Sequence, residues 1–391
     1  MSGHATRDHA ILSASGSSRW LTCTPSAQLE EQYENTTSVF AEEGTTAHEL
    51  AEDFLRKELG LIAKGTFTRR LNKMKKENEH YSQSMLDYVE NYATIVLEHI
   101  SELKQYSSDV LTLLEERLDF SRWVPQGFGT GDVVLVADQT LEVIDLKYGK
   151  GVPVSAEGNT QMRLYALGAL NQFEMLYDIE NVRMTIVQPR LDSVSTDEIA
   201  ASDLLDWADE VVQPKAHEAI EGEGNFVAGE HCRFCKARSQ CRARAEKNLE
   251  LAQHDFQEPP LLSYEEIGEI LPKADELQKW AKDVQNYALD QAEKHGAKFP
   301  GYKLVEGRSN RKYTDEAAVI KRLKDEGYSE EDIYDMKVNG ITKMEKAIGK
   351  KPFKEYLSEY VIKPAGKPTL VKESDKRPEI NSTDSAVEDF S

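Results

Sequence analysis

Apolar residues recur at helical spacing in the first hundred residues of the chain. Residues 41–59 place Leu50, Phe54 and Leu55 on one stripe, which predicts an amphipathic helix. Residues 81–104 show the same period and predict a second helix. We therefore expect the N-terminal part of the chain, from about residue 11, to be mainly helical.

The pattern changes to short β-rich runs after residue 110. A strand is predicted within residues 110–120, and two more at Gly131–Ala137 (GDVVLVA) and Leu141–Lys147 (LEVIDLK), joined by a short polar turn typical of a hairpin. A helix, a buried strand and a second helix are then predicted over residues 157–171, 182–189 and 200–220. This order predicts an α/β fold, a mixed β-sheet flanked by helices.

The second half of the chain indicates a change of domain. Pro259 and Pro260 mark a linker, so we predict one domain over residues 1–257. A mostly helical accessory region is predicted over residues 261–365, with a strand-like piece at Tyr302–Val305. Residues 371–391 are rich in Ser, Asp and Glu and are predicted to form a disordered acidic tail.

Charge narrows the classes of function. The 391 residues carry a formal net charge of -21 and a pI near 5.0, which argues against a general nucleic-acid coat protein. Local basic stretches are compatible with phosphate contacts all the same. One runs from Arg69 to Lys76. The other consists of Arg308, Arg311 and Lys312, which we predict to bind DNA. Each stretch alone also fits a solvated surface.

Membrane insertion and secretion are not expected from the sequence. We find no apolar run of transmembrane length, and the N-terminus lacks the basic-then-apolar pattern of a signal peptide. The expected location is the cytoplasm, or the host cytoplasm if a phage encodes the protein.

Two aspartates and a lysine provide the main candidate chemistry. Asp132 begins one strand of the predicted hairpin, and Asp145 and Lys147 end the other. Carboxylates, with the backbone carbonyl of Leu146, suit a hard divalent cation, and a lysine two residues from Asp145 lies on the same strand face. Each residue alone also fits a structural role, Asp132 as a strand start and Lys147 as a solvated side chain.

These residues resemble a known family. Gly131-Asp132 followed by Ile144–Lys147 (IDLK) resembles the core motif of the PD-(D/E)xK nuclease superfamily. Gln161 and Tyr165 match the Q-x-x-x-Y helix motif of its RecB-like branch. The stretch from Gly44 to His48 resembles the upstream G-x-x-x-H motif of that branch. The proline that usually precedes the first aspartate is replaced by Gly131.

The resemblance covers roughly residues 10–245 and implies a restriction-endonuclease-like core. It implies that His48, Asp132 and Asp145 bind Mg²⁺ or Mn²⁺. Lys147 would assist catalysis, while Gln161 and Tyr165 would line the site. A lone helical histidine, or a Gln–Tyr pair spaced by four residues, is also common without function.

Four cysteines form a second constellation. Cys232, Cys235 and Cys241 follow the pattern C-x2-C-x5-C, and Cys23 lies far upstream. Four cysteines in so long a chain do not form a secreted disulfide framework, and their spacing suits a tetrahedral zinc or a [4Fe-4S] cluster. The arrangement resembles the iron-sulfur staple of AddB and of CRISPR-associated adaptation nucleases, which implies [4Fe-4S]. His231 beside Cys232 leaves zinc open.

The sequence thus predicts a metal-dependent deoxyribonuclease. Without a Walker A motif, it is expected to be a stand-alone nuclease rather than a helicase-nuclease. A resemblance to an uncharacterised phage-associated family implies an exonuclease of phage DNA replication or recombination, with DNA and phage replication or recombination proteins as partners. The alternative is a cluster-stapled DNA-binding or adaptor protein with a vestigial site. An RNA substrate also remains open.

Overall fold

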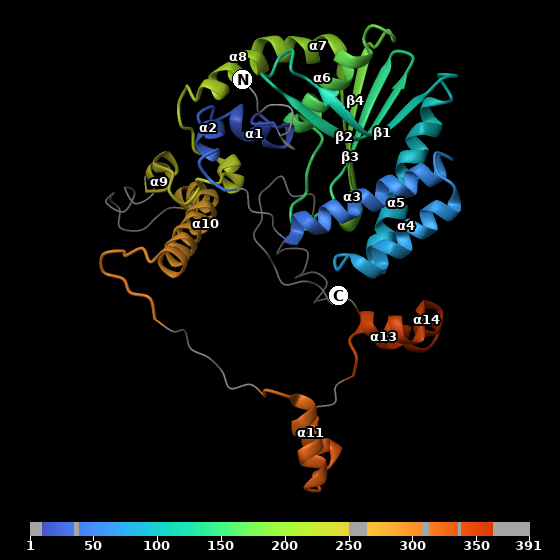
Figure 1. Cartoon of the computed structure of the whole chain (residues 1–391), viewed down its shortest axis with the longest axis vertical. Helices are drawn as coiled ribbons and strands as arrows, with labels where there is room; N and C mark the ends of the chain where they lie inside the picture. Colours follow the sequence, from blue (N-terminus) through green and yellow to red (C-terminus); the bar gives the residue numbers. More distant parts are fainter. Residues whose placement is uncertain (1–9, 35–38, 250–263, 306–312, 335–337, 363–391) are drawn as a thin grey trace, which may run out of the picture. The chain divides into compact units, whose positions relative to one another are not determined.

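The computed structural model describes residues 10–34, 39–249, 264–305, 313–334 and 338–362 (Figure 1). The chain divides into two compact units, Met1–Leu304 and Val305–Ser391. The division at residues 257–261 stays a prediction. The basic residues Arg308, Arg311 and Lys312, and the predicted acidic tail at 371–391, lie outside the described residues.

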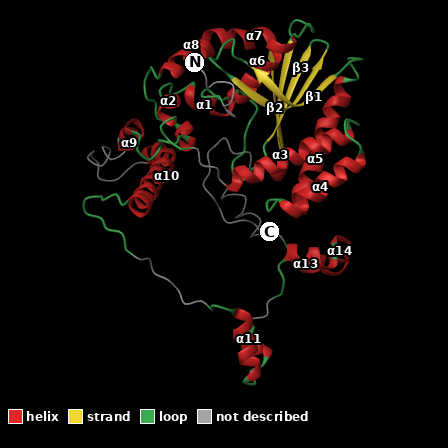
Figure 2. Ribbon diagram, in the orientation of Figure 1, coloured by secondary structure: helices red, strands yellow, loops and turns green. Residues whose placement is uncertain are grey.

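A mixed five-stranded sheet forms the centre of the first unit, with its strands in chain order (Figure 2). The strands are β1 (Leu111–Asp119), β2 (Phe128–Ala137), β3 (Thr140–Leu146), β4 (Asn181–Gln188) and β5 (Ser193–Ala200). All neighbours pair antiparallel except β3 and β4, which run parallel and are joined by helix α6 (Thr160–Phe173). The predicted α/β class with a mixed sheet is confirmed.

Helices cover both faces of the sheet. Those before β1 are α1 (Ser17–Trp20), α2 (Ser26–Glu30), α3 (Val39–Glu58), α4 (Lys64–Glu77) and α5 (Gln83–Leu103). Those after β5 are α7 (Ala201–Trp207), a π-helical turn (Ala208–Val212), α8 (Gln213–Glu221), α9 (Arg242–Leu249) and α10 (Tyr264–His295). Single 3-10 turns lie at Ala14–Gly16, Pro189–Leu191 and Glu230–Phe234.

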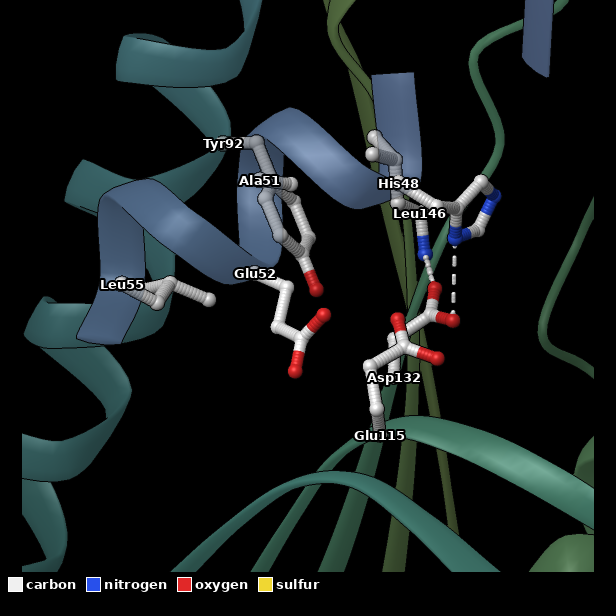
Figure 3. A pocket seen from close by; sticks show the side chains of 8 residues that line it. All are labelled: His48, Ala51, Glu52, Leu55, Tyr92, Glu115, Asp132 and Leu146. Atoms are coloured by element: carbon white, nitrogen blue, oxygen red, sulfur yellow. Dashed lines mark hydrogen bonds and ion pairs between the residues drawn. The ribbon is translucent and has the colours of Figure 1, made fainter. Parts of the chain in front are cut away.

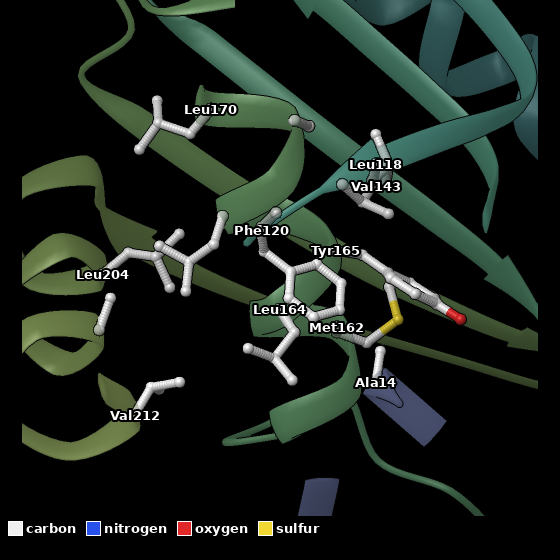
Figure 4. Packing of buried hydrophobic residues seen from close by; sticks show 14 of the residues in the cluster. Ala14, Leu118, Phe120, Val143, Met162, Leu164, Tyr165, Leu170, Leu204 and Val212 are labelled. Atoms are coloured by element: carbon white, nitrogen blue, oxygen red, sulfur yellow. The ribbon is translucent and has the colours of Figure 1, made fainter. Parts of the chain in front are cut away.

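Each face of the sheet has its own apolar core. Helix α6 packs on the first face, where Met162, Leu164 and Leu170 meet Leu118 and Val143 (Figure 4). Gly168 permits the close approach, because a Cβ there would lie 2.9 Å from the side chain of Leu118 and 3.1 Å from its backbone. Helices α3 and α5 cover the second face, where the core includes Leu50, Val89, Val133 and Ile144.

The second unit is helical in its described part. It contains α11 (Glu316–Asp325), α12 (Glu330–Ile333), α13 (Ile341–Ile348), α14 (Lys350–Leu357) and a 3-10 turn (Ser358–Tyr360). This agrees with the expected mostly helical C-terminal region. No helix in the described part of either unit combines the length and apolarity needed to span a bilayer.

The sequence analysis was wrong about one strand and missed another. Tyr302–Val305 is not a strand, because apolar residues alone, without a neighbouring strand to pair with, do not form one. Conversely, Ser193–Ala200 pairs with β4 as the edge strand β5, which the sequence pattern did not indicate. Its side chains alternate between half-buried and exposed and are mostly polar, so the strand carries no apolar run.

A polar network lies inside the second face of the sheet. The carboxylate of Glu142 on β3 is fully buried, and its Oε1 accepts a hydrogen bond from Thr185 Oγ1 at 2.9 Å. Nδ1 of His99, on α5, lies 2.8 Å from the same oxygen. Arg183 NH1 lies 3.8 Å from Oε2. Such a carboxylate is tolerated because it is paired.

This network predicts a pH-dependent contribution to stability. The hydrogen bond with Glu142 raises the pKa of His99 above its usual 6.5, and the charge of Glu102 adds to the increase, against burial and Arg183. Because the folded-state pKa is raised, the contribution is full below pH 6.5 and is lost as the pH rises through the raised pKa. We expect His99→Gln to lower the free energy of unfolding by about 1–3 kcal/mol at pH 6, and by less at pH 9. Urea denaturation at both pH values tests this, and exposed His217→Gln is the control. A difference independent of pH would contradict it.

Candidate metal centre

The pairing of β1 and β2 is interrupted at one level of the sheet. The register pairs Leu114 with Val133 and Glu116 with Gly131, which leaves Glu115 and Asp132 opposite each other and unpaired. Glu115 has a φ of 51°, in the left-handed region that residues other than glycine rarely adopt. Non-glycine residues in this region often mark functional sites.

The interruption changes the direction of the side chains. Gly131 faces Leu118 in the first core, whereas Val133 lies in the second core. Asp132 contacts His48 of α3, so Asp132 and Val133 face the same side of the sheet despite being adjacent. The acidic side chains are therefore presented to α3 and α5 rather than to α6.

Three side chains from three elements come together there. Nδ1 of His48 lies 3.0 Å from Oδ1 of Asp132, and the backbone N–H of Leu146 donates to Oδ2 of Asp132 at 2.6 Å. Ligand atoms of His48, Glu115 and Asp132 all lie within 4.8 Å of one another. Figure 3 shows both carboxylates turned toward a small cavity. The cavity is lined by His48, Ala51, Glu52, Leu55, Tyr92, Glu115, Asp132 and Leu146.

The electrostatics of the group indicate an excess of negative charge. Burial alone lowers the pKa of His48, but the charge and hydrogen bond of Asp132, with Asp145 and Glu115, outweigh it and raise the pKa to about 9. Burial, and then the charge of Asp132, raises the pKa of Glu115 to about 7. The group therefore attracts positive charge, which a proton or a cation can supply.

The donor set fits a divalent cation. Two carboxylates and an imidazole suit Mn²⁺, and carboxylates suit Mg²⁺. The hydroxyl of Tyr92 adds an independent observation, since the residue is only 1% exposed and its oxygen has no hydrogen-bond partner among the described residues. Figure 3 shows this hydroxyl directed into the cavity. A buried hydroxyl is costly without a partner, and a hydrated cation would supply one.

A second set of polar side chains runs from β3 to α6. Nζ of Lys147 lies 2.7 Å from Oδ2 of Asp145 and donates to Oε1 of Gln161 at 3.1 Å. Nε2 of Gln161 then donates to the Tyr165 hydroxyl at 3.1 Å. Tyr165 lies directly against β2, because a Cβ on Gly129 would be 2.5 Å from its ring.

The buried carboxylate of Asp145 forms an ion pair with the half-buried Lys147. Burial raises the pKa of Asp145 above its usual value, and Lys147 opposes this effect. Burial lowers the pKa of Lys147, but Asp145 reverses this and holds the lysine protonated. The charges of Asp132 and His48 also act on Asp145, so the chain from β3 to α6 and the His48 group belong to one electrostatic site.

Most residues predicted from the sequence are brought together here. His48 contacts Asp132, and Asp145, Lys147, Gln161 and Tyr165 form a continuous chain. The backbone carbonyl of Leu146 remains a predicted ligand, while its N–H holds Asp132 in place. The sequence analysis missed Glu115 and Tyr92. The available signal for Glu115 was an acidic residue directly after the apolar run Leu111–Leu114.

The four cysteines line a second cavity. Cys23, Cys232 and Cys235 are buried, and Cys241 is partly buried. Their sulfur atoms do not form a compact ligand group, because no three of these described residues have all sulfurs within 4.8 Å of one another. Burial, and then the charge of Glu30, raises the pKa of the Cys235 thiol to about 12, so metal binding there would release a proton.

Hydrogen bonds that do not involve the cysteines also join residues 24–30 to residues 220–236. Thr24 Oγ1 donates to the Glu223 carbonyl at 2.6 Å, and Gln28 Nε2 donates to the Ile220 carbonyl at 2.6 Å. The backbone N–H of Lys236 donates to Glu30 Oε1 at 2.8 Å. The fold thus places Cys23 near the other three cysteines without a bound metal.

Comparison with known proteins matches the chain to a protein family and to solved structures. A family model described as "Protein of unknown function (DUF2800)" matches residues 9–378. The crystal structure of SSO0001 matches at 19% sequence identity, covers 45% of this chain and 81% of that chain, and gives a TM-score of 0.21. Neither description names an activity.

Proposed function

We propose that this chain, which belongs to the DUF2800 family, is a metal-dependent nuclease that hydrolyses phosphodiester bonds in DNA. The observation that carries the proposal is the convergence of His48, Glu115 and Asp132 beside the Asp145–Lys147 ion pair. Hydrolysis of a phosphodiester needs both a hard cation and a fixed positive charge, and this site offers ligands for the first and a lysine for the second.

The ligands would come from both sides of the interrupted ladder. The structure groups three of the proposed ligands, His48, Glu115 and Asp132. The sequence motifs suggested two more, Asp145 and the backbone carbonyl of Leu146. A bound Mg²⁺ or Mn²⁺ supplies Lewis acidity to the phosphoryl group and makes a coordinated water more acidic. Leu146 N–H fixes Asp132, and Asp132 in turn orients His48.

Lys147 would act on the substrate rather than on the cation. Its ammonium is held by Asp145 on one side and by Gln161 on the other, so its position is set before substrate binds. A fixed ammonium stabilises the negative charge that develops on the phosphoryl oxygens. Gln161 positions Lys147, and Tyr165 positions Gln161.

The finer assignment rests on the sequence motifs. We propose that the chain is a RecB-like member of the PD-(D/E)xK superfamily and acts as an exonuclease in phage DNA replication or recombination. The four cysteines are proposed to bind a [4Fe-4S] cluster, with Zn²⁺ as the alternative, and their shared cavity supports a common ligand. Phage replication or recombination proteins are the proposed partners on the same resemblance, and the cytoplasm is the proposed location.

The proposal is tested with anaerobically purified protein and end-labelled linear and circular DNA. We expect cleavage of linear DNA with Mg²⁺ or Mn²⁺ and little with Ca²⁺, whose longer bonds and looser geometry position the attacking water poorly. RNA of the same sequence is included as a second substrate. DNA binding without cleavage under every metal condition would favour the alternative, an adaptor with a vestigial site.

Glu115 is predicted to be a cation ligand. Glu115→Gln keeps the size of the side chain but removes its charge, so we expect Mn²⁺ affinity to fall by about tenfold or more. The matched control is Glu116→Gln, because this neighbour instead accepts a hydrogen bond from Gln172 of α6. Isothermal titration with Mn²⁺ measures both. Equal affinities for the two variants would remove Glu115 from the site.

A further inference from the structure

Helix α4 presents a basic face in an acidic protein. Its 14 residues include six cationic side chains, Lys64, Arg69, Arg70, Lys73, Lys75 and Lys76, and a single acidic one, Glu77. All six are exposed. The whole chain has 48 basic and 69 acidic residues, so this helix is strongly biased against the composition around it.

The basic residues lie on the side of α4 that faces solvent. Phe67, Leu71 and Met74 recur at helical spacing and pack toward the core, with the Phe67 ring 5.7 Å from that of Phe54 on α3. Arg69, Lys73 and Lys76 have the same spacing and fall on the opposite side of the helix. The orientation of α4 is thus fixed by its apolar side, and its basic side is left for solvent or a ligand.

Local interactions account for only some of these charges. Arg70 is paired with Asp53 of α3, and Lys75 and Lys76 are in the last turn, where cations interact favourably with the helix dipole. Lys73 has a weak pair with Glu77 at 3.9 Å, and Arg69 has no acidic partner within 4.0 Å in the described part of the chain. A solvated face would normally mix both signs of charge, as α3 does with its acidic and basic residues.

Contacts connect helix α4 to the helix that lines the candidate metal centre. Helix α4 packs on α3, which contributes His48 and Glu52 to the metal cavity. Asp53, the partner of Arg70, directly follows Glu52. The basic face is therefore anchored to the helix that supplies the predicted ligand His48.

We propose that Arg69, Lys73 and Lys76 of α4 form a phosphate-binding track that guides a DNA strand to the candidate metal centre. The choice of DNA rests on the proposed function, since a phosphodiester substrate is the anion that this site would act on. From Arg69 to Lys76 the helix rises about 10 Å. That length corresponds to about three base-pair rises of 3.4 Å along the axis of a DNA duplex. Cations at this spacing contact successive phosphates without reading the bases.

The test compares two triple variants with the same change in net charge. Arg69→Gln/Lys73→Gln/Lys76→Gln neutralises the track while keeping good helix-forming residues. Lys273→Gln/Lys279→Gln/Lys282→Gln is the control, because these exposed lysines lie on α10 of the same unit. Fluorescence anisotropy with labelled DNA, in metal-free buffer, gives the affinity over a range of salt concentrations. Circular dichroism checks that both variants are folded.

The track variant is expected to bind DNA about tenfold more weakly at low salt, and the slope of log affinity against log salt should fall by about 2 to 3. The control should keep the wild-type slope. Equal slopes for the two variants would overturn the proposal. The proposal would also be overturned if the track variant lost binding to phosphatidylglycerol vesicles but bound DNA as the wild type does, because the track would then recognise a lipid surface.

A small substrate separates this inference from the proposed function. Bis(4-nitrophenyl) phosphate is too short to reach from the metal centre along the helix, so the track variant should hydrolyse it at the wild-type rate. A track variant that loses hydrolysis of both substrates, while folded, would place these residues in the catalytic site instead and overturn the track. Weakened DNA binding in the track variant, with no cleavage by the wild-type protein, would support the track and refute the nuclease.

Discussion

Replacing Asp145 with alanine is expected to lower the rate of Mg²⁺-dependent DNA cleavage by about a thousandfold or more. The carboxylate is 3% exposed, is surrounded by Lys147, Asp132 and His48, and holds the ammonium of Lys147 at 2.7 Å. Its loss removes a proposed ligand and releases the lysine at the same time. Steady-state cleavage of end-labelled linear DNA measures the effect.

The fold should survive this change. Lys147 is 27% exposed at its side chain and keeps its hydrogen bond to Gln161, so it is not left as an isolated buried charge. Asp145→Asn is the companion variant, because it keeps an oxygen for Lys147 while removing the charge. Asp138→Ala, in the exposed turn between β2 and β3, is the control and should cleave normally. Wild-type rates from Asp145→Ala, in a preparation free of contaminating nuclease, would end the assignment.

Variants of the neighbouring residues separate binding from chemistry. Asp132→Ala should lose both Mn²⁺ affinity and cleavage, because Asp132 lies in the ligand group with His48 and Glu115. Lys147→Ala should lose cleavage but retain Mn²⁺ binding, since the lysine is proposed to act on the phosphoryl group. A Lys147→Ala protein that no longer binds Mn²⁺ would instead make the lysine a support for the ligands.

The hairpin explains why part of the site was predictable from sequence. Two β-rich runs joined by a short turn bring the start of one strand beside the end of the next, so Asp132 and Asp145 were expected to be close. Gln161 and Tyr165, four residues apart, share one side of α6 in any helix. Such relations depend only on local spacing, which the sequence contains.

Glu115 and Tyr92 were not predictable in the same way. Strict alternation would place Asp132 and Val133 on opposite faces, but the positive φ of Glu115 and the interrupted ladder put them on the same one. Tyr92 looks like any core residue of an amphipathic helix, and only the packing of α5 on the sheet directs its hydroxyl into the cavity. Both depend on tertiary structure. The polar edge strand β5 was missed for a related reason, since its pairing with β4 leaves no apolar pattern.

Cys23→Ala is expected to abolish metal binding by the four cysteines and to lower the melting temperature by about 10 °C or more. Cys23 and Cys232 would close a loop of roughly two hundred residues, a constraint on the order of 5 kcal/mol by the disputed loop-entropy model, and metal–thiolate bonding adds to it. The hydrogen bonds of Thr24, Gln28 and Glu30 across the same junction should still let the variant fold. Calorimetry of anaerobic protein, with iron, sulfide and zinc analysis, measures the outcome.

Ser26→Ala is the matched control for this prediction. Ser26 lines the same cavity, is buried, and its hydroxyl has no hydrogen-bond partner among the described residues, so its removal deletes one atom without removing a sulfur ligand. It should keep about four irons per chain, the content of a cubane cluster, and the wild-type melting temperature. If the wild-type protein contains stoichiometric zinc and no iron, the four cysteines bind zinc rather than a [4Fe-4S] cluster, and the bound metal still joins Cys23 to the other three cysteines. Identical stability and metal content in Cys23→Ala and wild type would refute the staple itself, because a ligand that joins the two ends cannot be removed without cost.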